Sequence, residues 1–176
     1  MVKLFRYLES LPDLVNNFFY NMERKRSRER NAPDFTPSGI LANYENRKNG
    51  EIMLYTEPLD CKVPDFHWQL FQFKENEEDP IRVDLCDFSF FTIGRDNLST
   101  IKIIHPSISK QHGVIQFKQR KREVLPYLID LNSKFGCSLN GKHLDSSRFY
   151  ELRHKDLLKF GGFPDDFILI KGDKLP

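Results

Sequence analysis

Short apolar or alternating runs recur from about residue 52 onward, and turn residues separate them. The runs cover residues 52–55, 68–73, 88–93, 101–104, 114–117, 124–131, 157–160 and 167–170. Between them lie the acidic run 75–79, which ends at Pro80, and the pairs Asn140-Gly141 and Gly161-Gly162. Many short strands with spaced turns are typical of a β-sandwich. The pattern therefore predicts an all-β antiparallel sandwich over residues 51–176.

Two of the turns are specific enough to place. Asn140-Gly141 predicts a two-residue hairpin, because both residue types tolerate positive φ. The acidic run 75–79 predicts a solvated hairpin loop between two strands.

The first 50 residues differ in pattern and predict a tail with a helical part and an extended part. Within residues 2–20, large apolar side chains recur at roughly helical spacing, with Pro12 as an interruption: Leu4, Phe5, Leu8, Leu11, Val15, Phe18 and Phe19. We expect a short amphipathic helix that packs on the domain or on a partner. Glu9 and Asp13 argue against a membrane-surface helix and against a mitochondrial presequence.

Two further segments of the tail carry candidate chemistry. Residues 24–30 form a basic run, which is either a solvated face or a nuclear-import or RNA-contacting arm. Residues 32–41 contain Pro33, Pro37 and Gly39 beside isolated apolar residues such as Phe35. Proline disfavours helix and sheet, so this segment is either a linker or an extended peptide for a partner's groove.

Composition narrows the class of protein. Residues 1–31 hold seven basic and four acidic residues, whereas the whole chain of 176 residues carries +2, so the remainder is near −1. A near-neutral body argues against nucleic acid as the main partner. Cys61, Cys86 and Cys137 show no metal-ligand spacing, and with no signal peptide in view we expect a reducing compartment. No run of 18 apolar residues exists, so we expect no membrane span.

Three segments between predicted strands concentrate polar residues. Gly94-Arg95 follows an apolar run, residues 105–112 lie between two runs, and residues 130–140 follow a third. Loops at one end of a sandwich converge, which would place four side chains on one rim: Arg95, Ser109, Lys110 and Lys134. Cations and a hydroxyl around one point suit a phosphate or an acidic peptide.

The same segments resemble the signature of the forkhead-associated (FHA) domain. The resemblance rests on Gly94-Arg95, on Ser109-x-x-His112 and on Ser133-x-x-Gly136 through Asn140, and it covers about residues 66–172. Further segments are similar to the Smad nuclear-interacting protein 1 and pre-mRNA leakage protein 1 family. They are residues 37–41 (Pro-Ser-Gly-Ile-Leu), 55–58, 68–70, 105–112, 150–152 and 156–161.

The family resemblance implies a function and partners. It implies a nuclear, non-enzymatic subunit of the retention-and-splicing (RES) complex of the spliceosome, without cofactor or metal. The tail would dock onto a subunit bearing an RNA-recognition motif, with a third subunit alongside, through Asp34, Phe35, Pro37, Ser38, Gly39, Ile40 and Leu41. Arg95 and Ser109 would hold a phosphothreonine peptide, with Lys110 as a second phosphate-facing side chain.

Other residues of the signature have structural roles in the family, and the chain departs from it in one loop. Gly94, His112, Gly136 and Asn140 would shape the site rather than bind the ligand. Where the family usually has Ser-x-Asn-Gly-Thr, this chain has Ser133-Lys134-Phe135-Gly136-Cys137. In the family, the Asn side chain of this loop is expected to form a hydrogen bond with the backbone of the bound peptide. Phe135 stands in its place and cannot form that bond, whereas Lys134 adds a cation. We therefore expect weak, altered or lost phosphopeptide binding, with the domain persisting as a scaffold.

Three other functions compete with this interpretation. Cys137, His112 and Asp130 could form a nucleophile, base and orienting group, although no local catalytic signature surrounds them. Direct RNA binding would rest on the basic run 24–30 and is expected to be accessory at most. A phosphopeptide-reading adaptor in nuclear signalling or the DNA-damage response shares the fold but not the Pro-Ser-Gly tail.

Overall fold

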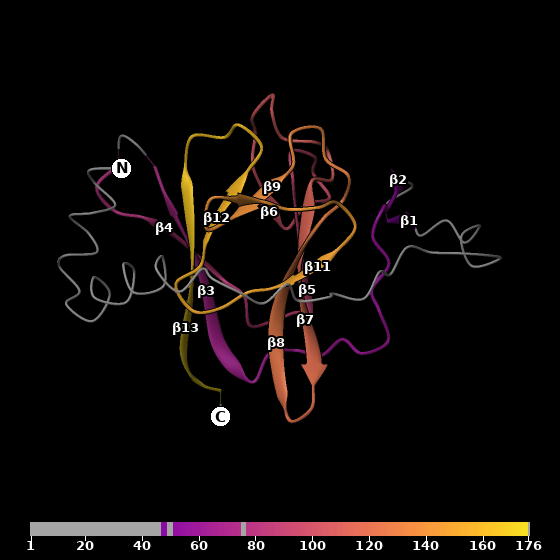
Figure 1. Ribbon diagram of the computed structural model, residues 1–176, viewed down its shortest axis with the longest axis vertical. Coiled ribbons are helices and arrows are strands. Elements are labelled where there is room, and N and C mark those ends of the chain that lie inside the picture. The colour runs from indigo at the N-terminus through magenta and orange to yellow at the C-terminus, as the bar shows by residue number, and fades with distance from the viewer. Residues whose placement is uncertain (1–46, 49–50, 75–76, 176) are drawn as a thin grey trace.

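The computed structural model describes residues 47–48, 51–74 and 77–175, and this part of the chain contains strands and no helix (Figure 1). The amphipathic segment 2–20, the basic run 24–30 and the docking segment 34–41 lie outside the described residues. The strands are β1 (Arg47–Lys48), β2 (Glu51–Ile52), β3 (Phe66–Phe73), β4 (Ile81–Asp84), β5 (Phe90–Gly94), β6 (Ile101–Lys102), β7 (Gly113–Arg120), β8 (Glu123–Asp130), β9 (Cys137–Leu139), β10 (Lys142–His143), β11 (Phe149–Glu151), β12 (Leu157–Phe160) and β13 (Asp166–Lys174).

Two sheets form the sandwich, as Figure 1 shows. One has the order β10-β9-β12-β13-β3-β4 and the other the order β11-β8-β7-β5-β6, while β1 and β2 pair only with each other. Neighbouring strands are antiparallel, apart from β5 and β6, which pair in parallel. The all-β sandwich predicted from the sequence is therefore confirmed.

The main core lies between the sheets and is rich in aromatic side chains. Trp68 and Leu70 alternate inward along β3, and Phe117 of β7 meets them from the other sheet. Phe160 and Phe167 pack edge to face with ring centroids 5.1 Å apart. Such pairs add about 0.5–1.5 kcal/mol to the burial of their apolar area.

A second apolar cluster covers the outer face of the five-stranded sheet. Residues 53–62, here called the strap, run across this face and bury Tyr55 against Val114, Ile129 and Phe149. At the far end of β7, the strap is fastened by Gln119 N–H, which donates to the Asp60 carbonyl over 2.8 Å. The strap thus makes the region before β3 an integral part of the domain.

The strap corrects one predicted strand. The run 52–55 was expected to be a strand, but only Glu51–Ile52 is one, and Met53 to Tyr55 continue without a ladder partner. The reason is that side chains hold this segment: the Tyr55 hydroxyl donates to Gln116 Oε1 over 2.6 Å.

Several local predictions can be compared with the structure. The Asn140-Gly141 hairpin is confirmed, because Leu139 pairs with Lys142 and both turn residues have positive φ, 51° and 76°. The loop over the acidic run joins the antiparallel pair β3 and β4, as expected. No predicted apolar run marked the short strands β1, β4, β9, β10 and β11. The described residues include no helix that could cross a membrane.

Candidate anion-binding site

The loops after β5, before β7 and after β8 meet at one end of the sandwich, and hydrogen bonds at Ser109 and Lys110 tie them together. Arg95 N–H donates to the Ser109 carbonyl over 3.1 Å, and Asp96 N–H donates to the Lys110 carbonyl over 3.3 Å. From the third loop, Lys134 N–H donates to Ser109 Oγ over 3.2 Å. The structure therefore brings Arg95, Ser109, Lys110 and Lys134 into one neighbourhood.

The rim of this neighbourhood is cationic. Arg95, Lys110 and Lys134 are exposed, and Ser109 is half-buried. Among the described residues no carboxylate forms an ion pair with any of the three cations; Lys134 Nζ lies 5.4 Å from the ring centroid of its neighbour Phe135. Cations carried by loops whose backbones meet at Ser109 suit an anionic ligand, and each charge-assisted hydrogen bond to an anion contributes about 1.5–3 kcal/mol before ordering costs.

Two positions in these loops favour glycine, one for close backbone approach and one for its positive φ. A Cβ on Gly94 would overlap the Lys110 carbonyl oxygen and lie 2.6 Å from Ser99 Oγ. A Cβ on Gly136 would overlap the ring of His143. At Gly94 a side chain would push apart the backbone of two site loops, whereas at Gly136 it would displace the exposed His143 ring and strain a backbone with a φ of 69°.

The buried side chain of His112 forms hydrogen bonds with two of the loops. Ser109 N–H donates to its Nδ1 over 3.1 Å, so Nδ1 is unprotonated and the proton lies on Nε2. Nε2 then donates to the Gly136 carbonyl over 3.1 Å, with Ser133 Oγ 3.3 Å away. Burial lowers the pKa of His112, which favours this neutral form.

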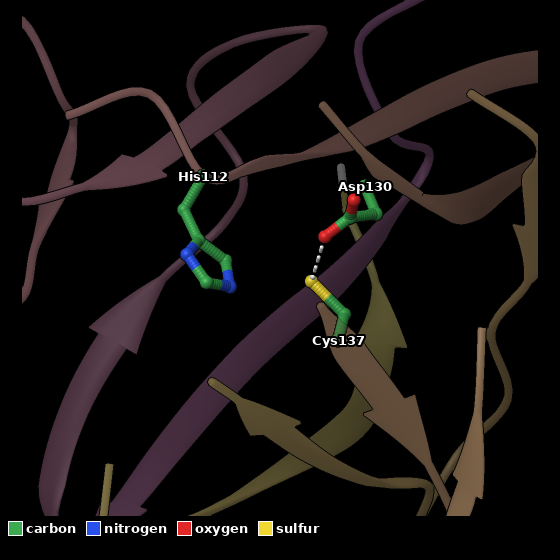
Figure 2. A group of neighbouring side chains, drawn as sticks. All are labelled: His112, Asp130 and Cys137. Carbon is green, nitrogen blue, oxygen red and sulfur yellow. Dashed lines mark hydrogen bonds between the residues drawn. The ribbon is translucent and has the colours of Figure 1, made fainter. Parts of the chain in front are cut away.

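His112, Asp130 and Cys137 lie together, with ligand atoms within 4.8 Å of one another (Figure 2). Figure 2 shows the Cys137 sulfur directed at the Asp130 carboxylate, to which it donates over 3.1 Å. Burial, followed by the Asp130 charge, raises the pKa of the Cys137 thiol well above its ordinary value. A reactive cysteine needs a lowered pKa and access to substrate, and this thiol is only 1% exposed.

The buried carboxylate serves the third loop instead. Asp130 accepts from Ser133 N–H over 3.0 Å and from Ser133 Oγ over 2.6 Å. A metal ion between His112, Asp130 and Cys137 would have to displace these bonds and those of the imidazole. The group therefore acts chemically as a loop anchor, because its donors and acceptors satisfy one another.

Asn140 lies apart from the three loops. Its Nδ2 donates to Asp156 Oδ1 over 2.7 Å, and its Oδ1 accepts from Leu157 N–H over 2.9 Å. These bonds fasten the β9–β10 turn to β12. The sequence-predicted docking residues, Asp34 to Leu41, lie outside the described residues.

Comparisons with known proteins identify the family of this chain. A family profile described as FHA domain matches residues 91–161. Smad nuclear-interacting protein 1 of Mus musculus is 36% identical over 158 residues, which are 82% of this chain and 41% of that protein. Pre-mRNA leakage protein 1 of Saccharomyces cerevisiae is 31% identical over 165 residues, 76% of this chain and 81% of that protein. The chain belongs to the family of these two proteins.

A solved structure supports the assignment to the pre-mRNA leakage protein 1 family. The structure described as the yeast Pml1 splicing factor and its integration into the RES complex matches with a TM-score of 0.62 and 28% identity. The match covers 68% of this chain and 97% of that chain. By contrast, the chain spans less than half the length of the mouse family member.

The structure also explains a motif whose role the sequence did not reveal. The segment Tyr55-x-Glu57-Pro58 carried the resemblance without a function. In the structure, Glu57 Oε1 accepts from Ser89 Oγ and, over 3.2 Å, from Gln116 Nε2. Tyr55 and Glu57 therefore fasten the strap to β7 and to the start of β5.

Proposed function

We propose that this protein is a non-enzymatic interaction subunit in pre-mRNA splicing, located in the nucleus and assembled into the RES complex. The observation that supports this most is the similarity to the yeast splicing factor over nearly all of that chain. The sequence match to yeast pre-mRNA leakage protein 1, which covers 81% of that protein, also supports the proposal.

In this proposal the protein has two separate binding regions. Residues 51–176 form the FHA domain, and residues 1–50 form the tail, in which the segment from Asp34 to Leu41 docks onto the RNA-recognition-motif subunit. The third subunit of the complex lies alongside. RNA contacts by the basic run 24–30 are accessory, because the folded body is near neutral.

The FHA domain binds a phosphothreonine or acidic peptide through Arg95, Ser109, Lys110 and Lys134. Support comes from the three loops that meet at Ser109 and from the cations that lack an ion-pair partner among the described residues. Gly94, Gly136 and His112 maintain the loop geometry, and Asn140 maintains the neighbouring turn. Since Phe135 has no side-chain amide to bond the peptide backbone, the affinity for the peptide is modest and depends on its anionic group.

Calorimetry with the full chain tests the site. We expect a phosphothreonine peptide to bind, its unphosphorylated form to bind at least ten-fold more weakly, and Arg95→Ala to lose about ten-fold or more. Arg122→Ala is the matched control, because Arg122 is exposed in the β7–β8 hairpin, at the other end of β7. Equal losses in the two variants would refute the assignment of Arg95.

Co-purification tests the assembly. The full chain recovered from nuclear extract should carry splicing factors, and recovery with DNA-repair factors in their place would support the adaptor alternative.

A further inference from the structure

The beginning of the strap presents two apolar side chains to solvent. Met53 and Tyr55 are buried, whereas Ile52 just before the strap is 47% exposed and Leu54 is 65% exposed. This alternation is that of an extended chain, in which successive side chains point to opposite sides. Burial of Met53 and Tyr55 therefore fixes Ile52 and Leu54 on the outward side.

Gln111 fixes the same segment beside the cationic rim. Its Oε1 accepts from Leu54 N–H over 2.8 Å, and its Nε2 donates to the Ile52 carbonyl over 2.8 Å. The side-chain amide thus bonds the strap as a neighbouring strand would. Gln111 directly follows Lys110, so the backbone of Leu54 lies within about 10 Å of the Lys110 backbone, roughly three residues of extended chain.

We propose that Ile52 and Leu54 form an apolar ledge that binds an apolar side chain of the same peptide whose anionic group lies at Arg95, Ser109 and Lys110. This inference rests on the proposed function of the loops. It assigns the ligand a chemistry: an extended peptide with one phosphorylated or acidic residue and an apolar residue two to four positions away.

Two features select this occupant. The ledge is continuous with the rim through Gln111, and a ligand that spans both must be anionic at one point and apolar at another. An oligonucleotide would match the cations and find one ring for stacking, Phe135, which is 51% exposed, but the aliphatic side chains of the ledge offer its bases none. An extended peptide can carry an anionic residue at one position and an apolar residue at another, as the rim and the ledge require.

The test uses the full chain and synthetic phosphothreonine nonapeptides in calorimetry. One peptide has serine at every flanking position, and the others carry a single leucine at each flanking position in turn. We expect at least one peptide with leucine two to four positions from the phosphothreonine to bind about five-fold more tightly than the serine peptide. Leu54→Ser should abolish this preference without weakening the serine peptide.

Leu59→Ser is the matched control, because Leu59 is a fully exposed leucine of the same strap. It lies next to Asp60, which bonds Gln119 at the far end of β7, about 25 Å from Gln111. A leucine preference that survives Leu54→Ser, or the absence of any preference among peptides that bind, would refute the ledge alone. Failure of every phosphopeptide to bind would refute the proposed function of the loops and the ledge with it.

Discussion

Gly94→Ala tests whether close backbone approach builds the cationic rim. The added Cβ would overlap the Lys110 carbonyl oxygen, which is backbone and has no rotamer to change. Either β5 or the loop before β7 must move. Both movements stretch the bonds from Arg95 N–H to Ser109 and from Asp96 N–H to Lys110, which are 3.1 and 3.3 Å long.

The magnitude follows from these contacts. Overpacking of a closely packed position costs about 1–3 kcal/mol, and two weakened backbone hydrogen bonds cost about 1 kcal/mol each. We therefore expect the free energy of unfolding to fall by about 3–5 kcal/mol. Gly162→Ala is the matched control, because a Cβ there meets only Ser107 atoms at 3.6 and 3.7 Å, which is ordinary contact. Its effect should stay within about 1 kcal/mol of zero.

Urea denaturation of both variants measures the difference, with comparable m-values as the condition for comparison. In the same samples, phosphopeptide affinity should fall in Gly94→Ala, because Arg95 and Lys110 no longer share one geometry. A Gly94→Ala variant as stable as Gly162→Ala would show that this backbone contact is absent in solution.

Two further predictions concern the tail and the buried histidine. Phe35→Ala in the full chain should lose the RNA-recognition-motif subunit in a pull-down, whereas Tyr44→Ala, outside the Pro-Ser-Gly segment, should retain it. Burial lowers the pKa of His112 in the folded state, so the unfolded chain takes up a proton first as the pH falls. The stability that its neutral form provides is complete above about pH 6.5 and is lost below it. An NMR titration in which the His112 ring protonates above pH 6.5 would contradict this.

The parts of the fold that could be predicted are those encoded by neighbouring residues. The strands around Trp68, Phe117 and Phe160 carry enough large apolar side chains to show in the sequence. The hairpin at Asn140 was predictable because two successive residues must adopt positive φ. The site loops could be proposed because each directly follows or precedes such a strand.

The parts that could not be predicted depend on contacts between distant segments or on very few residues. Strand β4 has four residues and one neighbour, β3, so most of its side chains are exposed and no apolar period appears. Strands β10 and β11 have two and three residues, too few for a period. The bond between Gln111 and Leu54 joins residues 57 positions apart, and nothing near either residue indicates it.

Anion binding at the rim benefits from a loop backbone that is already fixed, because the cationic side chains lose entropy when they bind. Arginine and lysine side chains lose about 1.5–2 kcal/mol each when they are fixed, which cancels much of the 1.5–3 kcal/mol that each bond to an anion contributes. Net affinity therefore depends on groups that are already in place before the ligand arrives. His112 and Asp130 supply such order by bonding the loop backbone from below. Phe135 supplies no side-chain amide to bond the backbone of the peptide. Further affinity must therefore come from peptide residues other than the anionic one, and the ledge at Leu54 lies close enough to contact them.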